Sequence, residues 1–281
     1  MRLMLPIGLS LVTISIILLA DASAQVLNDS SASYWYEEGQ RCLRNGSFEA
    51  AINSFDIAIA EGRTYDNYWD ALYGKAKALY DLGRYKDGID LCDDILNDPN
   101  GPQGDGIVRF LELDGNFYTA YEDKYGLPPI TRDENAQYSG EIPENYQLAM
   151  ARYDEALELE PNLTTAWNSK GVALGQLYKF DESIQCFDRA IDLDSDLAEV
   201  WNNKGVSLDW LGRHNQSMGC YDRAIELKPD LAVAWMNRAS TISLNLSLFS
   251  LAQENANHAG ELDQSLKNES SFWNWRYIRL F

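Results

Sequence analysis

Few side chains in this 281-residue chain are suited to catalysis or metal binding. It has two histidines and four cysteines, which is little material for a zinc site or a disulfide framework. His214 is expected to fill a ring position at a helix corner and His258 lies in a segment of weaker pattern, so both are predicted to be structural. Ser183 and Ser217 are predicted at small core positions that no substrate would reach. We therefore predict that the chain is not an enzyme and has no catalytic residue, cofactor or metal ion.

Three alternating aspartates resemble the start of a calcium-binding loop. Asp192, Asp194 and Asp196 have the right spacing, but Leu197 and Asn203 stand where such a loop needs glycine and glutamate. We interpret the aspartates as an acidic linker.

The four cysteines are predicted to be free thiols. Cys186 and Cys220 fall at equivalent positions of stacked units that are at least about 8 to 10 Å apart, whereas a disulfide needs Cα atoms about 4.4 to 6.8 Å apart. Cys42 and Cys92 are expected at core positions, where they act as small apolar residues.

The charge of the chain excludes one class of partner. Lysine and arginine number 23 against 43 acidic residues, for a net charge of −20. Nucleic acid binding needs a basic surface, so we predict no nucleic acid partner.

The N-terminus has the order of an export signal. Met1 and Arg2 precede an uncharged run over 3–20, and Ala22 and Ala24 precede Gln25. We predict a signal peptide over 1–24 and a linker over 25–31, with an uncleaved N-terminal membrane anchor as the alternative, because an uncharged run of this length reaches the lower limit for spanning a bilayer. The predicted location is secreted or cell envelope, outside the cytoplasm. Six sequons agree with export and are candidate glycosylation sites: Asn28, Asn45, Asn162, Asn215, Asn245 and Asn268.

A single period organises the rest of the chain. Trp167, Trp201 and Trp235 follow one another at a constant interval. In the first helix of each repeat, a large residue is followed four places later by a small one, as in Trp167 with Gly171 and Trp201 with Gly205. In the second helix, small, large and small residues are spaced by four and three, which places them on one helix face. Examples are Ser183, Phe187, Ala190 and Ser217, Tyr221, Ala224.

This pattern resembles the tetratricopeptide repeat, a helix-turn-helix unit of about 34 residues, in the style common in archaea. The resemblance implies an all-α fold, a right-handed superhelical solenoid of antiparallel helix pairs. Glycine at the bend between paired helices agrees with it, as at Gly46, Gly83 and Gly212. We predict six repeats over 32–265, at 32–65, 69–102, 108–163, 164–197, 198–231 and a worn copy at 232–265.

Two segments depart from the repeats. The third repeat is much longer than the period allows and contains proline and glycine near 125–145, which predicts an inserted loop. Residues 266–281 are rich in aromatic side chains and are predicted to form a tail that caps the last repeat; a membrane-surface or partner-docking segment is the alternative.

The resemblance also implies a binding surface on the concave side of the first helices. Asn203 and Asn237 occupy positions at which family members often hydrogen-bond the main chain of a bound peptide, although asparagine is also common there without a ligand. Glu199 and Val233 stand where the subtype that binds a C-terminal carboxylate needs lysine, so a neutral or basic partner is favoured. The groove residues that the resemblance implies are Asn168, Ser169, Val172, Glu199, Asn202, Asn203, Val206, Met236, Asn237 and Ser240.

These patterns predict a protein–protein interaction scaffold at the cell envelope that binds a protein or peptide segment in the groove, with membrane contact only through an uncleaved N-terminal segment. The alternatives are a structural spacer or membrane-anchored envelope component that binds nothing, and an enzyme that uses the acidic loop of the third repeat. The sequence does not identify the partner.

Overall fold

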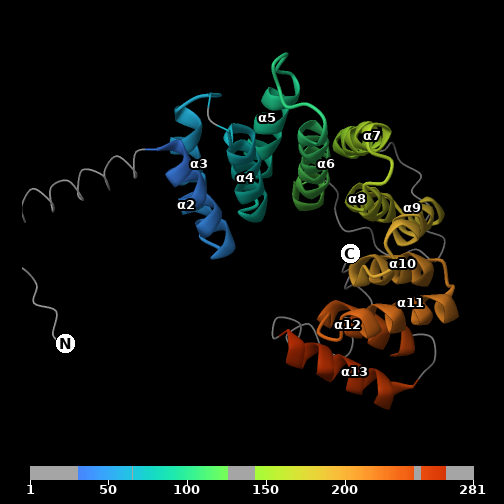
Figure 1. The fold of residues 1–281 in the computed structure, drawn as a ribbon. Helices are drawn as coiled ribbons and strands as arrows, with labels where there is room; N and C mark the ends of the chain where they lie inside the picture. The colour runs from blue at the N-terminus through green and yellow to red at the C-terminus, as the bar shows by residue number, and fades with distance from the viewer. Residues whose placement is uncertain (1–30, 65, 126–142, 244–247, 264–281) are drawn as a thin grey trace, which may run out of the picture. The chain divides into compact units, whose positions relative to one another are not determined.

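A computed structural model describes residues 31–64, 66–125, 143–243 and 248–263. These residues form twelve helices and no strand (Figure 1). The predicted signal peptide, most of the predicted loop and tail, and the sequons at Asn28, Asn245 and Asn268 lie outside this part of the chain. None of the helices described is both long and apolar enough to cross a bilayer.

The chain divides into two compact units: unit 1 ends at residue 106 and unit 2 begins at residue 107. The sequence pattern predicted no division there. Unit 1 contains two helix hairpins: α2 (Ala32–Arg44) with α3 (Phe48–Ala60), and α4 (Tyr68–Asp81) with α5 (Tyr85–Leu96). The Phe55 ring is fully buried between the first helices, where a Cβ atom added at Gly39 or Gly74 would lie 2.5 or 2.6 Å from it. These two glycines therefore let α2 and α4 close on one ring.

Unit 2 contains the remaining hairpins. α6 begins two residues before the division and belongs to this unit from residue 107 onward. Each later helix packs on the next from α7 to α13, and the first helices α8, α10 and α12 also contact one another in sequence (Figure 1). The bounds are α6 (Asp105–Tyr125), α7 (Glu144–Leu159), α8 (Thr164–Gln176), α9 (Phe180–Leu193), α10 (Ala198–Trp210), α11 (His214–Leu227), α12 (Ala232–Thr241) and α13 (Phe249–Leu262).

The predicted pairing of small and large residues explains how the hairpins α8–α9 and α10–α11 close. Phe187 and Tyr221 are buried in the second helices, and their rings lie against Gly171 and Gly205 of the first helices. A Cβ atom added at either glycine would be 2.6 Å from a ring carbon, closer than van der Waals contact permits. Glycine is therefore required by the close approach of the paired helices.

The three spaced tryptophans have a second role besides packing. Each indole N–H donates a hydrogen bond of 2.9 Å to the carbonyl oxygen six residues earlier, in the turn that precedes its helix: Trp167 to Pro161, Trp201 to Ser195, and Trp235 to Pro229. The sequence period thus repeats a turn contact as well as a core contact.

One turn departs from the glycine rule. Gly46, Gly83 and Gly212 have φ angles of 72°, 70° and 73° at the bend of their hairpins. Tyr178 takes that place between α8 and α9 with a φ of 61°, although a side chain is strained there. Its ring packs edge-on against Phe180, 5.7 Å between centroids, and is buried. We expect the burial of the ring to offset the backbone strain.

Candidate partner-binding surface

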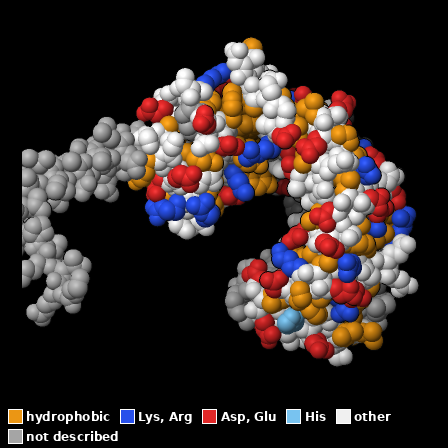
Figure 2. Space-filling model, in the orientation of Figure 1, with side chains coloured by type: hydrophobic (Ala, Val, Ile, Leu, Met, Phe, Trp, Pro, Cys, Tyr) orange, Lys and Arg blue, Asp and Glu red, His pale blue; other side chains and the backbone are white. Residues whose placement is uncertain are grey.

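The predicted groove residues lie on α8, α10 and α12, and we call the surface that they form the first-helix face. Acidic and basic side chains are interspersed over both units on the side of the molecule shown in Figure 2. On the first-helix face itself, most side chains are small or neutral. The residues assigned to this face are Asn168, Ser169, Val172, Glu199, Asn202, Asn203, Val206, Met236, Asn237 and Ser240.

Four asparagines form a continuous chain of amide hydrogen bonds across the three first helices. Asn203 Nδ2 donates to Asn168 Oδ1 at 3.1 Å, and Asn237 Nδ2 donates to Asn202 Oδ1 at 2.9 Å. Asn202 Nδ2 donates to Asn203 Oδ1 at 3.2 Å and joins the two links. We call this chain the asparagine ladder. Each link between repeats joins residues 35 apart, which is one more than the repeat length. The repeat therefore places the two asparagines of each link on adjacent first helices.

The ladder changes the role that the sequence assigned to its members. Asn202, Asn203 and Asn237 are 2%, 5% and 6% exposed, and they pair mainly with one another. Sequence reasoning expected Asn203 and Asn237 to offer their amides to a ligand. Asn203 uses both of its amide atoms within the ladder, whereas Asn237 uses only its Nδ2. These contacts form because the first helices approach closely enough for side chains on adjacent helices to meet.

Each end of the ladder has one polar atom that makes no hydrogen bond among the described residues. Asn168 is half-buried; its oxygen accepts from Asn203, and no hydrogen bond occupies its Nδ2 within the described part of the chain. At the other end, Asn237 uses its Nδ2 as a donor while its oxygen has no partner among the described residues. The ladder therefore holds an amide donor on α8 and an amide acceptor on α12 in fixed positions.

The other predicted groove residues are not equally accessible. Val206 and Met236 are 6% and 1% exposed, and Met236 belongs to the core between α12 and α13. Ser169, Val172 and Ser240 are half-buried, and Glu199 is exposed. The accessible part of the face is therefore made mainly by small side chains.

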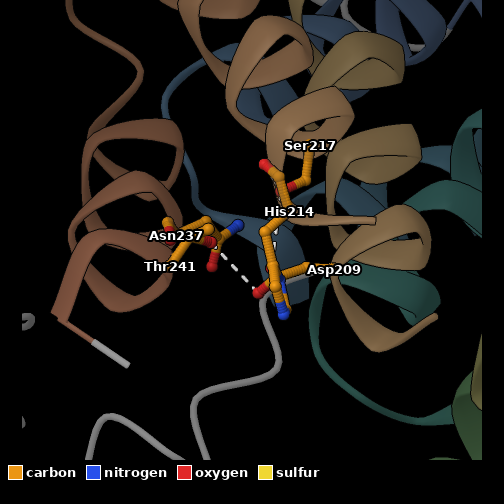
Figure 3. A network of polar contacts seen from close by, with 5 residues as sticks. All are labelled: Asp209, His214, Ser217, Asn237 and Thr241. Carbon is orange, nitrogen blue, oxygen red and sulfur yellow. Dashed lines mark hydrogen bonds and ion pairs between the residues drawn. The ribbon is translucent and has the colours of Figure 1, made fainter. Parts of the chain in front are cut away.

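A second polar network, which sequence reasoning missed, lies beside the ladder (Figure 3). Asp209, near the end of α10, accepts a hydrogen bond of 3.0 Å from the Thr241 hydroxyl of α12 and lies 2.6 Å from His214 Nδ1 of α11. The Thr241 hydroxyl shares its one hydrogen with the main-chain carbonyl oxygen of Asn237, 3.2 Å away, so the network touches a residue of the ladder. Ser217 is buried and bonds the His214 carbonyl oxygen, as its predicted structural role requires. Asp209 has no equivalent in the preceding repeat, where Gly175 stands, so the period could not reveal it.

Basic side chains that precede the small residue of each first helix are held by the previous hairpin. Lys170 pairs with Asp154, Lys204 with Asp188 at 2.5 Å, and Arg238 with Asp222 at 2.7 Å. Glu199 pairs with Lys228 at 2.7 Å, and that hydrogen bond lowers the pKa of the Glu199 carboxyl group. These ions are therefore largely neutralised within the protein.

The chemistry of the thiols agrees with structural roles. All four cysteines are buried and unbridged. Burial raises the pKa of Cys186 and Cys220 to about 11, because the thiolate is poorly solvated there. Among the residues that the structure describes, no group of histidine, cysteine and acidic side chains is arranged to hold a metal ion.

Known proteins match the chain at the level of family and fold. Family models described as tetratricopeptide repeat match residues 36–105, 164–197 and 198–231. The last two matches coincide with the fourth and fifth predicted repeats. No curated protein matches the chain.

Solved structures share the fold at low sequence identity. A thermophilic TPR protein from Thermus thermophilus is 17% identical, with a TM-score of 0.58 over 76% of this chain and 100% of that one. A tetratricopeptide repeat protein from Parabacteroides merdae is 13% identical, with a TM-score of 0.57 over 84% of this chain and 86% of that one. Together with the helix hairpins, the family matches show that the chain belongs to the tetratricopeptide repeat family of protein-interaction scaffolds.

Proposed function

We propose that this protein is a scaffold of the cell envelope that binds a peptide or protein segment on the first-helix face of unit 2. The asparagine ladder carries the proposal. Its ends present an amide donor on Asn168 and an acceptor on Asn237, and a peptide main chain offers the complementary carbonyl and N–H groups. Because the ladder fixes both side chains beforehand, less conformational entropy is lost when a partner binds.

The charge of the protein favours a neutral or basic partner. Glu199 on this face is already paired with Lys228, so the preference comes from the chain as a whole, which carries a net charge of −20. An acidic segment would be repelled, whereas a basic one would be attracted over a distance of about one Debye length, roughly 8 Å at physiological salt. The same charge disfavours nucleic acid.

The N-terminal sequence supports a location outside the cytoplasm, and the geometry of the sequons makes that location testable. Asn45 and Asn162 are exposed at turns, and the Ser47 hydroxyl of the first sequon is also exposed. Asn215 lies in α11, and its sequon serine, Ser217, is fully buried. We expect mass spectrometry of the protein from its native host to find an N-terminus at Gln25 and glycans on Asn45 and Asn162 but not on Asn215. A retained Met1 with none of these sites modified would contradict the proposed location.

The binding face is tested by capture of partners from an envelope extract. Ser169→Arg places a bulky side chain on the first-helix face, whereas Gln185→Arg places the same group on the exposed side of α9. We expect Ser169→Arg to remove the proteins that the wild type captures and Gln185→Arg to retain them. Thermal melting of both variants checks that they are folded.

The ladder is tested separately. Asn203→Ala and Asn237→Ala together break both links between repeats, so bound proteins should be lost. A spacer that binds nothing would capture no specific protein, and neither substitution would alter what is recovered. An enzyme would keep its turnover in both variants.

A further inference from the structure

One carboxylate beside the first-helix face has no basic partner. Glu112 lies on α6, is half-buried, and accepts a hydrogen bond of 3.0 Å from the Thr165 hydroxyl at the beginning of α8. Within the described residues, no lysine or arginine forms an ion pair with it. Glu199, on the face itself, is instead neutralised by Lys228 at 2.7 Å. The charge of Glu112 is therefore compensated only by a neutral donor.

The surroundings of Glu112 disfavour its negative charge. Burial raises the pKa of its carboxyl group, and the hydrogen bond from Thr165 lowers that pKa by less than burial raises it. Glu160, which is exposed in the turn between α7 and α8, raises the pKa further because the two carboxylates repel each other. The ionised form of Glu112 therefore does not stabilise the fold, whereas a cation placed beside both carboxylates would be bound favourably.

Glu112 continues the register of the asparagine ladder by one repeat. It is the fifth residue of the third predicted repeat, as Asn168 and Asn202 are of the fourth and fifth. Thr165 and Asn168 are three residues apart on α8, so their side chains are neighbours on one side of the helix, with Cβ atoms about 5 to 6 Å apart. Because the Thr165 hydroxyl contacts Glu112, the carboxylate lies about one helical turn from the Asn168 amide donor.

We propose that Glu112, together with Glu160, selects a lysine or arginine side chain in the segment that binds the first-helix face. This inference rests on the proposed function and adds a position to it: the net charge acts on a whole segment, whereas a fixed carboxylate acts on one side chain. Asn168 donates to a main-chain carbonyl oxygen of the segment. One or two residues farther along, at about 3.3 Å per residue in an extended chain, a basic side chain reaches Glu112. Hydrogen bonds between such ionised groups are stronger than those between neutral ones.

Selection of random phage-displayed peptides of about 12 residues on the immobilised full-length chain tests this proposal. Peptides that bind the face are those that the wild type recovers and Ser169→Arg does not. We expect them to carry lysine or arginine at one fixed position. Glu112→Gln with Glu160→Gln should abolish this preference, and the amide oxygen of Glu112→Gln can still accept the hydrogen bond from Thr165, so the fold is maintained.

A matched control separates the two carboxylates from the net charge. Glu158→Gln with Asp192→Asn removes the same number of charges at exposed positions of α7 and α9, and it should leave the preferred position unchanged. Fluorescence anisotropy of one recovered peptide then measures the size of the effect. Replacing its selected basic residue by norleucine should weaken binding to the wild type at least tenfold, but binding to the variant Glu112→Gln, Glu160→Gln less than twofold. The weakening should be smaller at 1 M salt, where the Debye length is about 3 Å.

Charge reversal provides the stricter arm. Glu112→Lys with Glu160→Lys should change the preference at the same position to aspartate or glutamate; thermal melting checks that this variant folds, and the glutamine variants decide the matter if it does not. The proposal is wrong if peptides that bind the face show no preferred basic position, or if Glu112→Gln with Glu160→Gln keeps that preference. In either case peptides still bind the face, so the proposed function stands. Recovery of no peptide that Ser169→Arg excludes would instead overturn the proposed function, and the selectivity with it.

Discussion

The hairpins α8–α9 and α10–α11 close in a different way from the last hairpin, α12–α13. In the first two, a buried ring fits against a glycine, as in Phe187 on Gly171. In the last, Ala256 holds the ring position and Ala239 the glycine position, and both lie in a core with Met236 and Ile242. The last hairpin thus replaces one large side chain by several smaller ones drawn partly from its first helix.

The last hairpin also differs at the binding surface. Asn168 and Asn202 hold the register that Met236 holds in α12, and Met236 is 1% exposed. At this register Met236 packs in the core between α12 and α13 and carries no polar group. The ladder ends at Asn237, which lies on α12, the last first helix in the described part of the chain.

The largest expected effect comes from removing a ring in a regular hairpin. Phe187→Ala should lower the free energy of unfolding by about 3 to 5 kcal/mol, because it leaves a cavity opposite Gly171. Ala256→Gly, at the same position of the last hairpin, should cost only about 1 kcal/mol. Urea unfolding of both variants measures the difference. Equal losses would show that the two hairpins close alike.

The next effect tests the glycine side of the same contact. Gly205→Ala should cost about 1 to 3 kcal/mol through the clash with the Tyr221 ring. Gly219→Ala is a matched control, because nothing lies within 4 Å of a Cβ atom added there; it should stabilise the protein by about 0.5 to 1 kcal/mol through helix propensity. If both substitutions stabilise the protein, the close approach of α10 and α11 is incorrect.

A smaller effect separates the two kinds of turn. Gly212→Ala should cost about 1 kcal/mol because its φ is 73°. Tyr178→Gly removes a similar strain and also the ring that packs on Phe180 and Trp210, so we expect a net loss of about 1 kcal/mol. A gain in thermal stability for Tyr178→Gly would show that this ring contributes less than the strain it brings.

The smallest effect concerns the ion pairs between hairpins. Lys204 pairs with Asp188 and lies 5.5 Å from the centre of the Trp201 ring. Lys204→Met keeps the apolar stem, so it should cost less than about 1 kcal/mol, and the cost should decrease at high salt. A clearly larger loss that salt does not change would point to packing instead.

The fold could be predicted from the sequence because its determinants are local and periodic. Trp167, Gly171 and Phe187 recur with the repeat period, and each spacing corresponds to one contact in the structure. The surface was harder to predict. Which groove residues are accessible depends on how closely neighbouring hairpins pack, and a pattern of residue types does not encode that distance. Asp209 was missed because its partners, His214 and Thr241, come from two other helices and do not repeat.

We propose that a partner binds to the first-helix face through the ends of the asparagine ladder. The most direct test is selective ¹⁵N labelling of asparagine and observation of the side-chain amide signals as a captured partner segment is added. We predict that the signals of Asn168 and Asn237 shift with the partner concentration, while those of Asn53 in unit 1 and Asn215 on α11 do not. Binding that shifts only Asn215, or leaves both ends of the ladder unchanged, would contradict the account.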